Sequence, residues 1–259
     1  MAETPPTVHE SAARGFARAA ADYERGRPTY PPEAIAFLAR VLGLAAARTV
    51  LDLAAGTGKL TRALAPHAGK LLAVEPVAAM RAKLEESLPE AEALAGSAEQ
   101  IPLPDGSVDA VTVGQAFHWF DGDASLAEIH RVLRPSGRLG LIWNARDEAV
   151  PWVARLTAIM EAHRRGTPGY RAGGWRPAFE RTTLFTPLER AEFRLEHELT
   201  PDGVVARVAS VSFIAALSDA AHEDVLGQVR KLLAEDPETR GRATVVLPYR
   251  TDVYWCGRR

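Results

Sequence analysis

The stretch VLDLAAGTGKLT, residues 50–61, constrains the fold of this chain more than any other segment. Apolar residues on both sides of Asp52 predict a short buried strand, and apolar residues after Lys59 return at helical spacing. Between them, the small residues from Ala54 to Gly58 predict a tight turn. In such a unit, backbone N–H groups of the loop and the helix N-terminus can approach a polar ligand closely. We therefore expect a strand, a ligand-binding loop and a helix.

A second apolar run, residues 71–74, ends on Glu75. In a βαβ nucleotide unit, a carboxylate at the end of the second strand holds the hydroxyl pair of a ribose. The loop and Glu75 together predict a cofactor that contains a nucleoside.

The details of the loop argue against two common nucleotide-binding motifs. A P-loop requires glycine where Leu53 stands, and serine or threonine where Leu60 follows Lys59. A dinucleotide fingerprint requires another small residue after the second glycine, where Leu60 and Thr61 stand. Asp52 would repel a pyrophosphate, whereas it suits a ligand that carries an ammonium group.

The loop, in the form D-x-A-x-G-T-G, strongly resembles motif I of class I S-adenosylmethionine-dependent methyltransferases, with Ala54 in place of the usual first glycine. The resemblance implies a Rossmann-like α/β fold with a mostly parallel seven-stranded sheet. It places the last strand antiparallel, between the fifth and sixth, and a helical cap over the strand carboxyl ends. It also implies that the cofactor is S-adenosyl-L-methionine. The residues expected to bind it are Arg27, Asp52, Ala54, Ala55, Gly56, Thr57, Gly58, Glu75, Pro76, Met80, Ser97, Ala98, Glu99 and Gln115.

Two further segments resemble a methyltransferase subgroup that includes trans-aconitate methyltransferases. The first is F-x-x-x-A-x-x-Y-x-x-x-R-P-x-Y-P, residues 16–31, which implies that Tyr23 and Arg27 lie over the methionine end of the cofactor. The alternative for this segment is ordinary packing of a helix on the sheet. The second is Q-A-F-H-W-F-D, residues 115–121, after the strand expected at 108–113. It implies that His118 and Trp119 face the pocket, the alternative being an aromatic core around a buried histidine.

Methyl transfer from a sulfonium requires that the nucleophile, the methyl carbon and the sulfur lie in line, so the protein contributes mainly positioning. If the acceptor is a carboxylate, no base is needed, and His118 would donate a hydrogen bond while arginines of the rim neutralise the acceptor. If the acceptor is a hydroxyl or a ring carbon, His118 is the best candidate for a general base. Tyr23 and Trp119 would shape the space for methyl transfer. Residues 144–147, which leave the fifth strand, are expected at the pocket rim.

The chain of 259 residues is expected to form a single methyltransferase domain. Within it we expect N-terminal cap helices at 11–43, a cofactor-binding core at 44–147, sheet completion with a substrate cap at 148–243, and a terminal strand at 244–259. Residues 166–177 show no periodicity and predict a lid or a substrate wall. Asp123 is expected to cap the helix at 123–133.

Composition excludes several other classes of protein. The net charge of −2 provides no general surface for nucleic acid or an anionic membrane. The only cysteine, Cys256, excludes an internal disulfide and a cysteine-based zinc site, and the histidines show no metal-ligand spacing. The first ten residues lack the apolar core of a signal peptide, and no apolar run reaches membrane-spanning length. We expect a cytoplasmic monomer or homodimer that binds no metal and acts on a small-molecule methyl acceptor.

Three functions remain open at this point. The first is methylation of a small carboxylic acid or secondary metabolite, with O-methylation favoured over N- or C-methylation of a natural product. The second is methylation of nucleic acid or protein, which the lack of an N-P-P-Y-like motif after the fourth strand disfavours. The third is a non-catalytic module that binds S-adenosylmethionine, because binding and turnover use the same loop residues.

Overall fold

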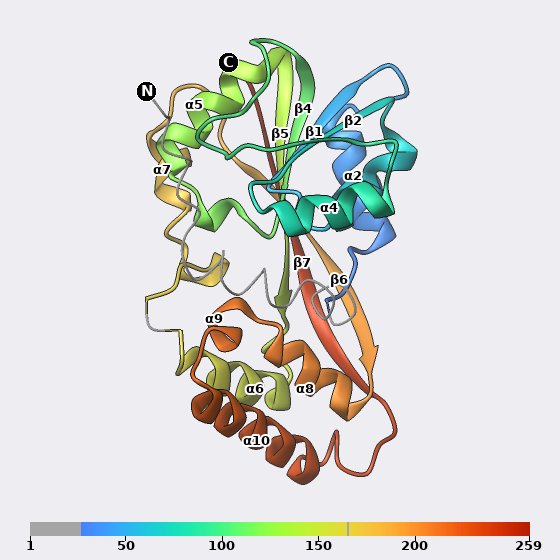
Figure 1. The fold of residues 1–259 in the computed structure, drawn as a ribbon, viewed down its shortest axis with the longest axis vertical. Coiled ribbons are helices and arrows are strands. Elements are labelled where there is room, and N and C mark those ends of the chain that lie inside the picture. Colours follow the sequence, from blue (N-terminus) through green and yellow to red (C-terminus); the bar gives the residue numbers. More distant parts are fainter. Residues whose placement is uncertain (1–26, 165) are drawn as a thin grey trace.

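The computed structural model describes residues 27–164 and 166–259 (Figure 1). In this part of the chain the strands form a seven-stranded sheet of order β3-β2-β1-β4-β5-β7-β6. The first five strands in this order are parallel, whereas β7 is antiparallel to both of its neighbours. The expected sheet, with its last strand antiparallel between the fifth and sixth, is confirmed. The strands are β1 (Thr49–Leu53), β2 (Lys70–Val74), β3 (Glu92–Leu94), β4 (Val108–Gly114), β5 (Leu133–Arg146), β6 (Glu189–Leu199) and β7 (Val245–Gly257).

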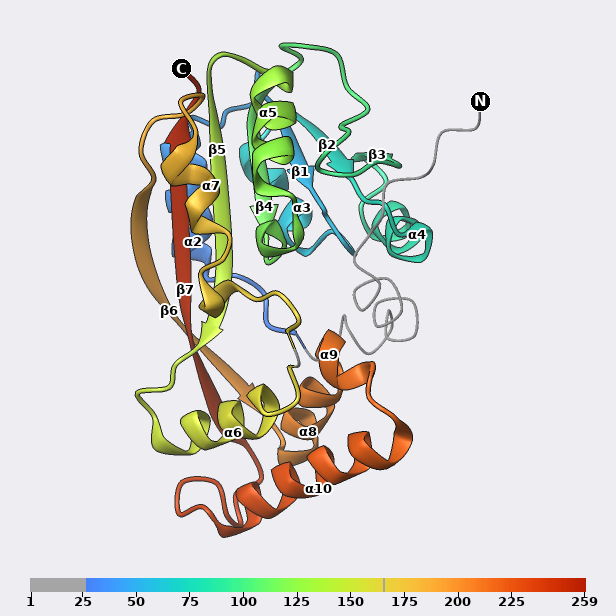
Figure 2. The same cartoon turned by 90° about the vertical axis from the view of Figure 1, so that its left-hand side faces the viewer.

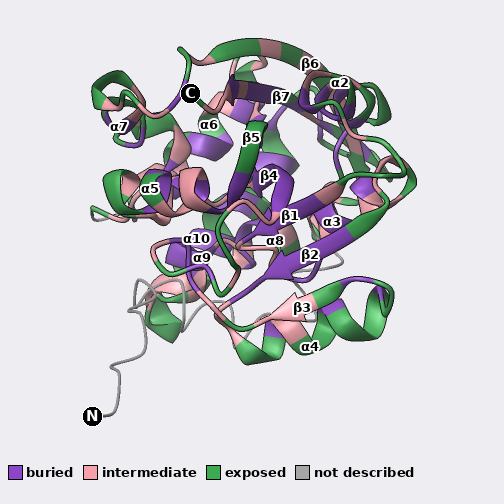
Figure 3. Cartoon of the chain, turned by 90° about the horizontal axis from the view of Figure 1, so that it is seen from above, coloured by how far each residue is buried: buried purple, intermediate pink, exposed green. Residues whose placement is uncertain are grey.

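Alternate residues of a strand point to opposite faces of the sheet, and here the residues on both faces are apolar. Helices therefore cover both faces. On β1, Leu51 and Leu53 pack in one core and Val50 in the other. The first core includes α5 (Gly122–Val132) and α7 (Arg176–Arg181), and the second includes α2 (Pro32–Leu42), α3 (Lys59–Leu64) and α4 (Ala78–Ser87) (Figure 2). Seen from above, β1, β2 and β4 are buried, and the outward faces of α4 and α5 are exposed (Figure 3).

A separate cap lies beyond the carboxyl end of β5 (Figures 1 and 2). It consists of α6 (Pro151–Glu161), α8 (Pro201–Ala209), α9 (Ser212–Ala215) and α10 (Asp219–Glu235), which share one hydrophobic core. The long strands β6 and β7 extend into this core, where Leu195, Leu247 and Tyr249 contact the cap helices. The two strands therefore connect the cap to the sheet.

The expected cap of helix α5 needs correction. Helix α5 begins at Gly122, and its cap is Asp121, whose side chain accepts a hydrogen bond from the Ala124 N–H at 3.1 Å. The prediction of Asp123 as the cap was wrong. The helix starts at Gly122, one residue before the predicted start, so the last residue with extended backbone is Asp121. Asp123 lies in the first turn and pairs with Arg181 at 2.9 Å.

The segment expected to lack regular structure, 166–177, contains the 3-10 turn η3 (Tyr170–Ala172) and the start of α7. Two other short 3-10 turns are η1 (Ala65–His67) and η2 (Phe117–Trp119). The N-terminal helix expected from residue 11, with Tyr23, lies outside the described residues. Among the residues that are described, no helix is both long and apolar enough to cross a membrane.

Candidate active site

The loop after β1 has the backbone of a close ligand contact. Ala54, Gly56 and Gly58 have φ values of 56°, 58° and 81°, all in the left-handed region that favours glycine. Gly58 is the N-cap of α3, and a Cβ added there would lie 2.9 Å from Leu84 Cγ. Ala54 adopts the left-handed conformation despite its side chain, at the position where the family motif usually has glycine. The loop therefore leaves backbone rather than side chains beside the cavity.

Asp52 lies at the carboxyl end of β1, with an exposed fraction of 1%. Its carboxylate accepts hydrogen bonds from Thr61 Oγ1 at 2.6 Å and Thr112 Oγ1 at 3.3 Å. Burial raises the pKa of this carboxyl to about 7, and the two hydroxyl hydrogen bonds oppose that shift. Among the described residues no basic side chain forms an ion pair with Asp52. A ligand ammonium would supply the missing charge.

Glu75 follows β2 and braces the loop. Its two carboxylate oxygens accept hydrogen bonds from the Gly56 N–H at 2.8 Å and the Val77 N–H at 2.9 Å. Burial raises the pKa of Glu75, and these hydrogen bonds act in the opposite direction. Each oxygen retains a lone pair that can accept from a ribose hydroxyl.

Three expected cofactor-binding residues, Met80, Ser97 and Glu99, follow Glu75 in the chain and line the same cavity. Met80 is buried, and its Sδ lies 3.8 Å from the place a Cβ of Gly56 would take. Ser97 Oγ is buried without a hydrogen-bond partner among the described residues. Glu99 accepts a hydrogen bond from the Asp121 N–H at 3.1 Å. A buried hydroxyl that lacks a partner in a cavity wall indicates a place for a polar ligand group.

Two cavities share the loop and bring most expected site residues together. The larger, of about 260 Å³, is lined by Arg27, Ala54, Gly56, Glu75, Pro76, Met80, Ser97, Ala98, Glu99, Gln115, His118 and Trp119, among others. The smaller, of about 80 Å³, adds Asp52, Ala55 and Thr57. Gly58 lines neither cavity, so its contribution is the turn itself. Phe117 is fully buried in the core and lies outside both, so the aromatic segment 117–120 divides between core and cavity.

The orientation of His118 is set by a tryptophan of β5. The indole Nε1 of Trp143 donates to His118 Nδ1 over 3.4 Å. An indole N–H can only donate, so Nδ1 must be unprotonated and the ring proton of the neutral imidazole is on Nε2. Burial lowers the pKa of His118 to about 3, with the charges of Arg164 and Arg27 adding to the effect. At neutral pH His118 is therefore an uncharged hydrogen-bond donor.

The second half of the chain contributes residues that sequence reasoning missed. The larger cavity is also lined by Arg164, Tyr170, Arg171, Arg207 and Tyr249, and by Arg146 from the expected rim segment. Polar residues recur along one side of the helices in 202–234, which is a signal for Arg207, but this spacing does not show which side faces the cavity. Tyr249 belongs to the terminal strand, where alternation indicates only that it points to one face.

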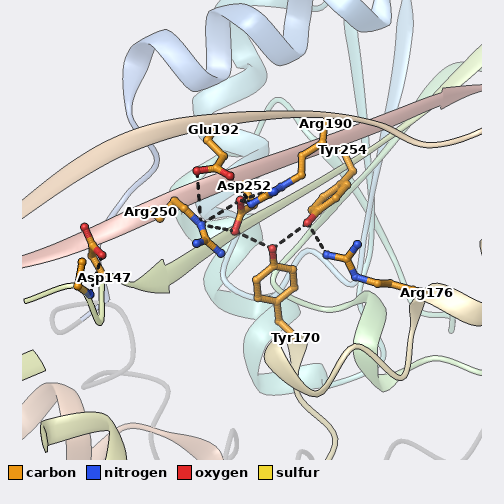
Figure 4. Close-up of polar contacts among 9 residues, drawn as sticks. Asp147, Tyr170, Arg176, Arg190, Glu192, Arg250, Asp252 and Tyr254 are labelled. Carbon is orange, nitrogen blue, oxygen red and sulfur yellow. Dashed lines mark hydrogen bonds and ion pairs between the residues drawn. The ribbon is translucent and has the colours of Figure 1, made fainter. Parts of the chain in front are cut away.

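A polar network around the buried Asp252 holds Tyr170 against the sheet (Figure 4). Tyr170 Oη donates to Asp252 Oδ2 at 2.6 Å and lies 3.0 Å from Tyr254 Oη, to which Arg176 donates. Asp252 is fully buried on β7, and Arg190 pairs with it at 2.5 Å. The Tyr170 ring stacks on Trp143 with centroids 4.8 Å apart. Through this stack the expected lid segment packs directly on the tryptophan that orients His118.

The sheet order, the loop after its first strand and the cavity beside that loop define a class I methyltransferase. Residues 51–141 match the sequence pattern of the methyltransferase domain family. Together with relatives that match over nearly the whole chain, this match shows that the chain belongs to this family. It is an S-adenosylmethionine-dependent methyltransferase, with a methyl acceptor as its second substrate.

Relatives match over nearly the whole chain. An uncharacterized methyltransferase of Mycobacterium tuberculosis is 44% identical over 239 residues, which cover 91% of this chain and 92% of the relative. A methyltransferase-like protein of Schizosaccharomyces pombe is 34% identical over 232 residues, covering 89% and 90%. A solved structure from Anaeromyxobacter dehalogenans has a TM-score of 0.68 and 25% identity, and the match covers 90% of this chain and 97% of that one.

Proposed function

We propose that this enzyme methylates a carboxylate oxygen of a small organic acid, in the manner of the subgroup that includes trans-aconitate methyltransferases. The observation that carries the proposal is the state of His118. Its Nδ1 accepts from Trp143 and its Nε2 bears the proton, so the one histidine among the described cavity residues does not serve as a base. An acceptor that is already nucleophilic fits such a site. A carboxylate is nucleophilic at neutral pH, whereas a hydroxyl is not.

The residues of the loop and of the neighbouring strand ends fit the cofactor. Asp52 would hold its ammonium group, and Arg27 its carboxylate. Glu75 would accept hydrogen bonds from the ribose, while Met80 packs on the adenine and Ser97 or Glu99 contacts its amino group. When bound, S-adenosylmethionine supplies a methyl group activated by the positive sulfonium. The protein's contribution is to hold the acceptor oxygen in line with it.

The acceptor side of the cavity favours an anion. The Nε2–H of His118 points to a donor role, and the guanidinium groups of Arg146 and Arg207, which pair with no carboxylate of the described residues, line the same space. Hydrogen bonds from arginine to a carboxylate are charge-assisted and geometrically specific. The cavity lies between the carboxyl ends of the strands and the cap, which favours a small acceptor over a macromolecule. Trp119 and Tyr23 are proposed to shape the space around the methyl group.

The test is product analysis with labelled S-adenosylmethionine and a panel of small carboxylic acids. We expect methyl esters, detected by mass spectrometry and cleaved by mild base. His118→Ala is expected to lower kcat/KM by roughly tenfold to a hundredfold, because it removes a hydrogen bond to a charged group. With saturating cofactor, kcat of the wild type should not follow the titration of a histidine between pH 6 and 9.

Three results would count against the proposal. Products methylated only at nitrogen or carbon would assign a different acceptor atom. A pH–rate profile with a limb near pH 6 to 7 that disappears in His118→Ala would make His118 a base. Full turnover of His118→Ala with the true acceptor would remove His118 from the chemistry altogether.

A further inference from the structure

The cavity wall opposite the loop contains three hydrogen-bond donors from three separate elements. Arg146 is the last residue of β5, and Tyr249 stands directly opposite it in the antiparallel pairing of β5 with β7. Arg207 comes from α8 in the cap. All three line the larger cavity.

Arg146 carries a positive charge on a half-buried side chain. Its Nε donates to Thr157 Oγ1 at 2.9 Å, and it forms no ion pair with a carboxylate in the described part of the chain. Burial lowers the pKa of Arg146 to about 10, and the neighbouring charge of Arg207 adds to this effect. The guanidinium is therefore still protonated at neutral pH. Withdrawing such a charge from water without a carboxylate to neutralise it is costly, so a counter-ion at this place is favoured.

Tyr249 and Arg207 also present buried polar atoms that have no hydrogen-bond partner within residues 27–164 and 166–259. Tyr249 is 2% exposed, and its hydroxyl makes no hydrogen bond to a described residue. The same is true of Arg207 Nε, although Arg207 Nη1 reaches Ser210 Oγ at 3.4 Å. Groups of this kind are rare in native structures and usually have a functional reason. Guanidinium groups only donate, and a phenol donates readily, so the ligand that satisfies all three is an acceptor of hydrogen bonds with negative charge.

Two other arginines of the cavity, unlike Arg146 and Arg207, are paired with carboxylates of the chain. Arg164 forms a two-pronged ion pair with Glu161, at 2.5 and 2.6 Å. Arg171 is paired with both oxygens of Glu148. The chain thus neutralises these guanidiniums with its own carboxylates, whereas Arg146 and Arg207 have none among the described residues.

We propose that Arg146, Arg207 and Tyr249 form a binding site for a second anionic group of the methyl acceptor, one that does not react. The substrate is then an acid with at least two negative charges, one of which receives the methyl group while the other fixes the molecule. This inference rests on the proposed function. Arg207 and Tyr249 also line the smaller cavity beside Asp52, whereas Arg146 lines only the larger one. Substitution of Arg146 therefore distinguishes a site for the acceptor from a site for the carboxylate of the cofactor.

The experiment compares acids matched in length, with and without a second carboxylate. Succinate and butyrate, and glutarate and valerate, are titrated by calorimetry into the wild type saturated with S-adenosylhomocysteine. We expect the diacids to bind at least about tenfold more tightly than the monoacids, because charge-assisted bonds to arginine are strong. Arg146→Met and Tyr249→Phe are expected to reduce this preference, the former to near unity. Arg146→Lys, which keeps the charge without the forked geometry, should retain part of it.

The matched control is Arg194→Met, the same substitution at an exposed position of β6, which should keep the full preference. Thermal unfolding of each variant identifies a variant that fails to fold. If Arg146→Met does not fold, Tyr249→Phe tests the same site with a milder change. Diacids that bind no better than monoacids, including no measurable binding of either, would overturn the proposal. So would an Arg146→Met variant that loses affinity for S-adenosylhomocysteine, since the site would then belong to the cofactor. Failure of the proposed function has a separate signature: no methyl ester from any acid, whatever the binding preference.

Discussion

Replacement of Asp52 by asparagine tests the electrostatics of the cofactor loop. In the folded protein burial raises the pKa of Asp52 from 3.8 to about 7. The unfolded chain releases this proton near the ordinary pKa, so between these two pH values the folded state binds more protons than the unfolded state. The contribution of Asp52 to stability therefore falls as the pH rises through this range and is constant above it.

The size of the effect follows from the two pKa values. Their difference is about 3, and each pKa unit corresponds to 1.36 kcal/mol, so ionised Asp52 destabilises the cofactor-free protein by at most roughly 4 kcal/mol above pH 7. Asparagine carries no charge, and its amide oxygen can accept from one of the two threonine hydroxyls while its NH2 group donates to the oxygen of the other. We expect Asp52→Asn to resemble the wild type near pH 4 and to become the more stable protein by pH 8.

The assay is urea unfolding of the cofactor-free protein at several pH values from 4 to 8. Asp224→Asn, at an exposed position of α10, serves as the matched control and should show a small difference from the wild type at every pH. A stability difference between Asp52→Asn and the wild type that does not change with pH would refute the reasoning.

The same pKa predicts a proton released on cofactor binding. An ammonium group beside Asp52 would stabilise the carboxylate and lower its pKa, so binding at pH 6 should release nearly one proton, and binding at pH 8.5 almost none. Calorimetric titration of S-adenosylhomocysteine in buffers of different ionisation enthalpy measures this number. Asp52→Asn should show weaker binding and no pH-dependent release. Equal proton release in variant and wild type would place the titrating group elsewhere.

Three further predictions concern the walls of the site. Gly58→Ala should lower the free energy of unfolding by about 1–3 kcal/mol, since it places a Cβ on left-handed backbone beside Leu84; an unchanged urea midpoint would contradict this. Tyr170→Phe should destabilise the protein by about 1–3 kcal/mol, because it removes a donor to the buried carboxylate of Asp252; thermal unfolding measures the loss, and no loss would show that the network is not stabilising. Ser97→Ala should leave the cofactor-free protein as stable or up to about 1 kcal/mol more stable and weaken S-adenosylhomocysteine binding; unchanged affinity would remove Ser97 from the cofactor site.

Local patterns were sufficient for the cofactor half of the molecule. Three features that lie close together in sequence carry the prediction: the apolar run before Asp52, the small residues from Ala54 to Gly58, and the carboxylate at Glu75. The apolar run predicts a strand, and the small residues predict a tight turn. Their order along the chain is that of a βαβ unit, so the sequence also indicates that the loop and Glu75 meet. The structure agrees, with Gly56 N–H donating to Glu75. The resemblance to class I methyltransferases then supplied the antiparallel last strand, which local periodicity does not contain.

The acceptor half was decided by tertiary structure. Helical spacing around Arg207 indicates an amphipathic helix, but the direction that its polar side faces depends on how the cap packs on the ends of β6 and β7. The pairing of Arg146 with Tyr249 depends on the register between two strands separated by about a hundred residues in the chain.

What the sequence determined by itself is the strand–loop–helix unit and a cofactor that contains a nucleoside, because short-range steric and hydrophobic patterns specify them. The resemblance to class I methyltransferases added the sheet order and the identity of the cofactor. The sequence predicted His118 at the pocket but left its role open between base and donor. The donor role that we propose depends on Trp143, whose indole N–H reaches the imidazole only when β4 and β5 lie side by side. The protonation state of a side chain follows from burial and from its partners, and both are properties of the assembled fold.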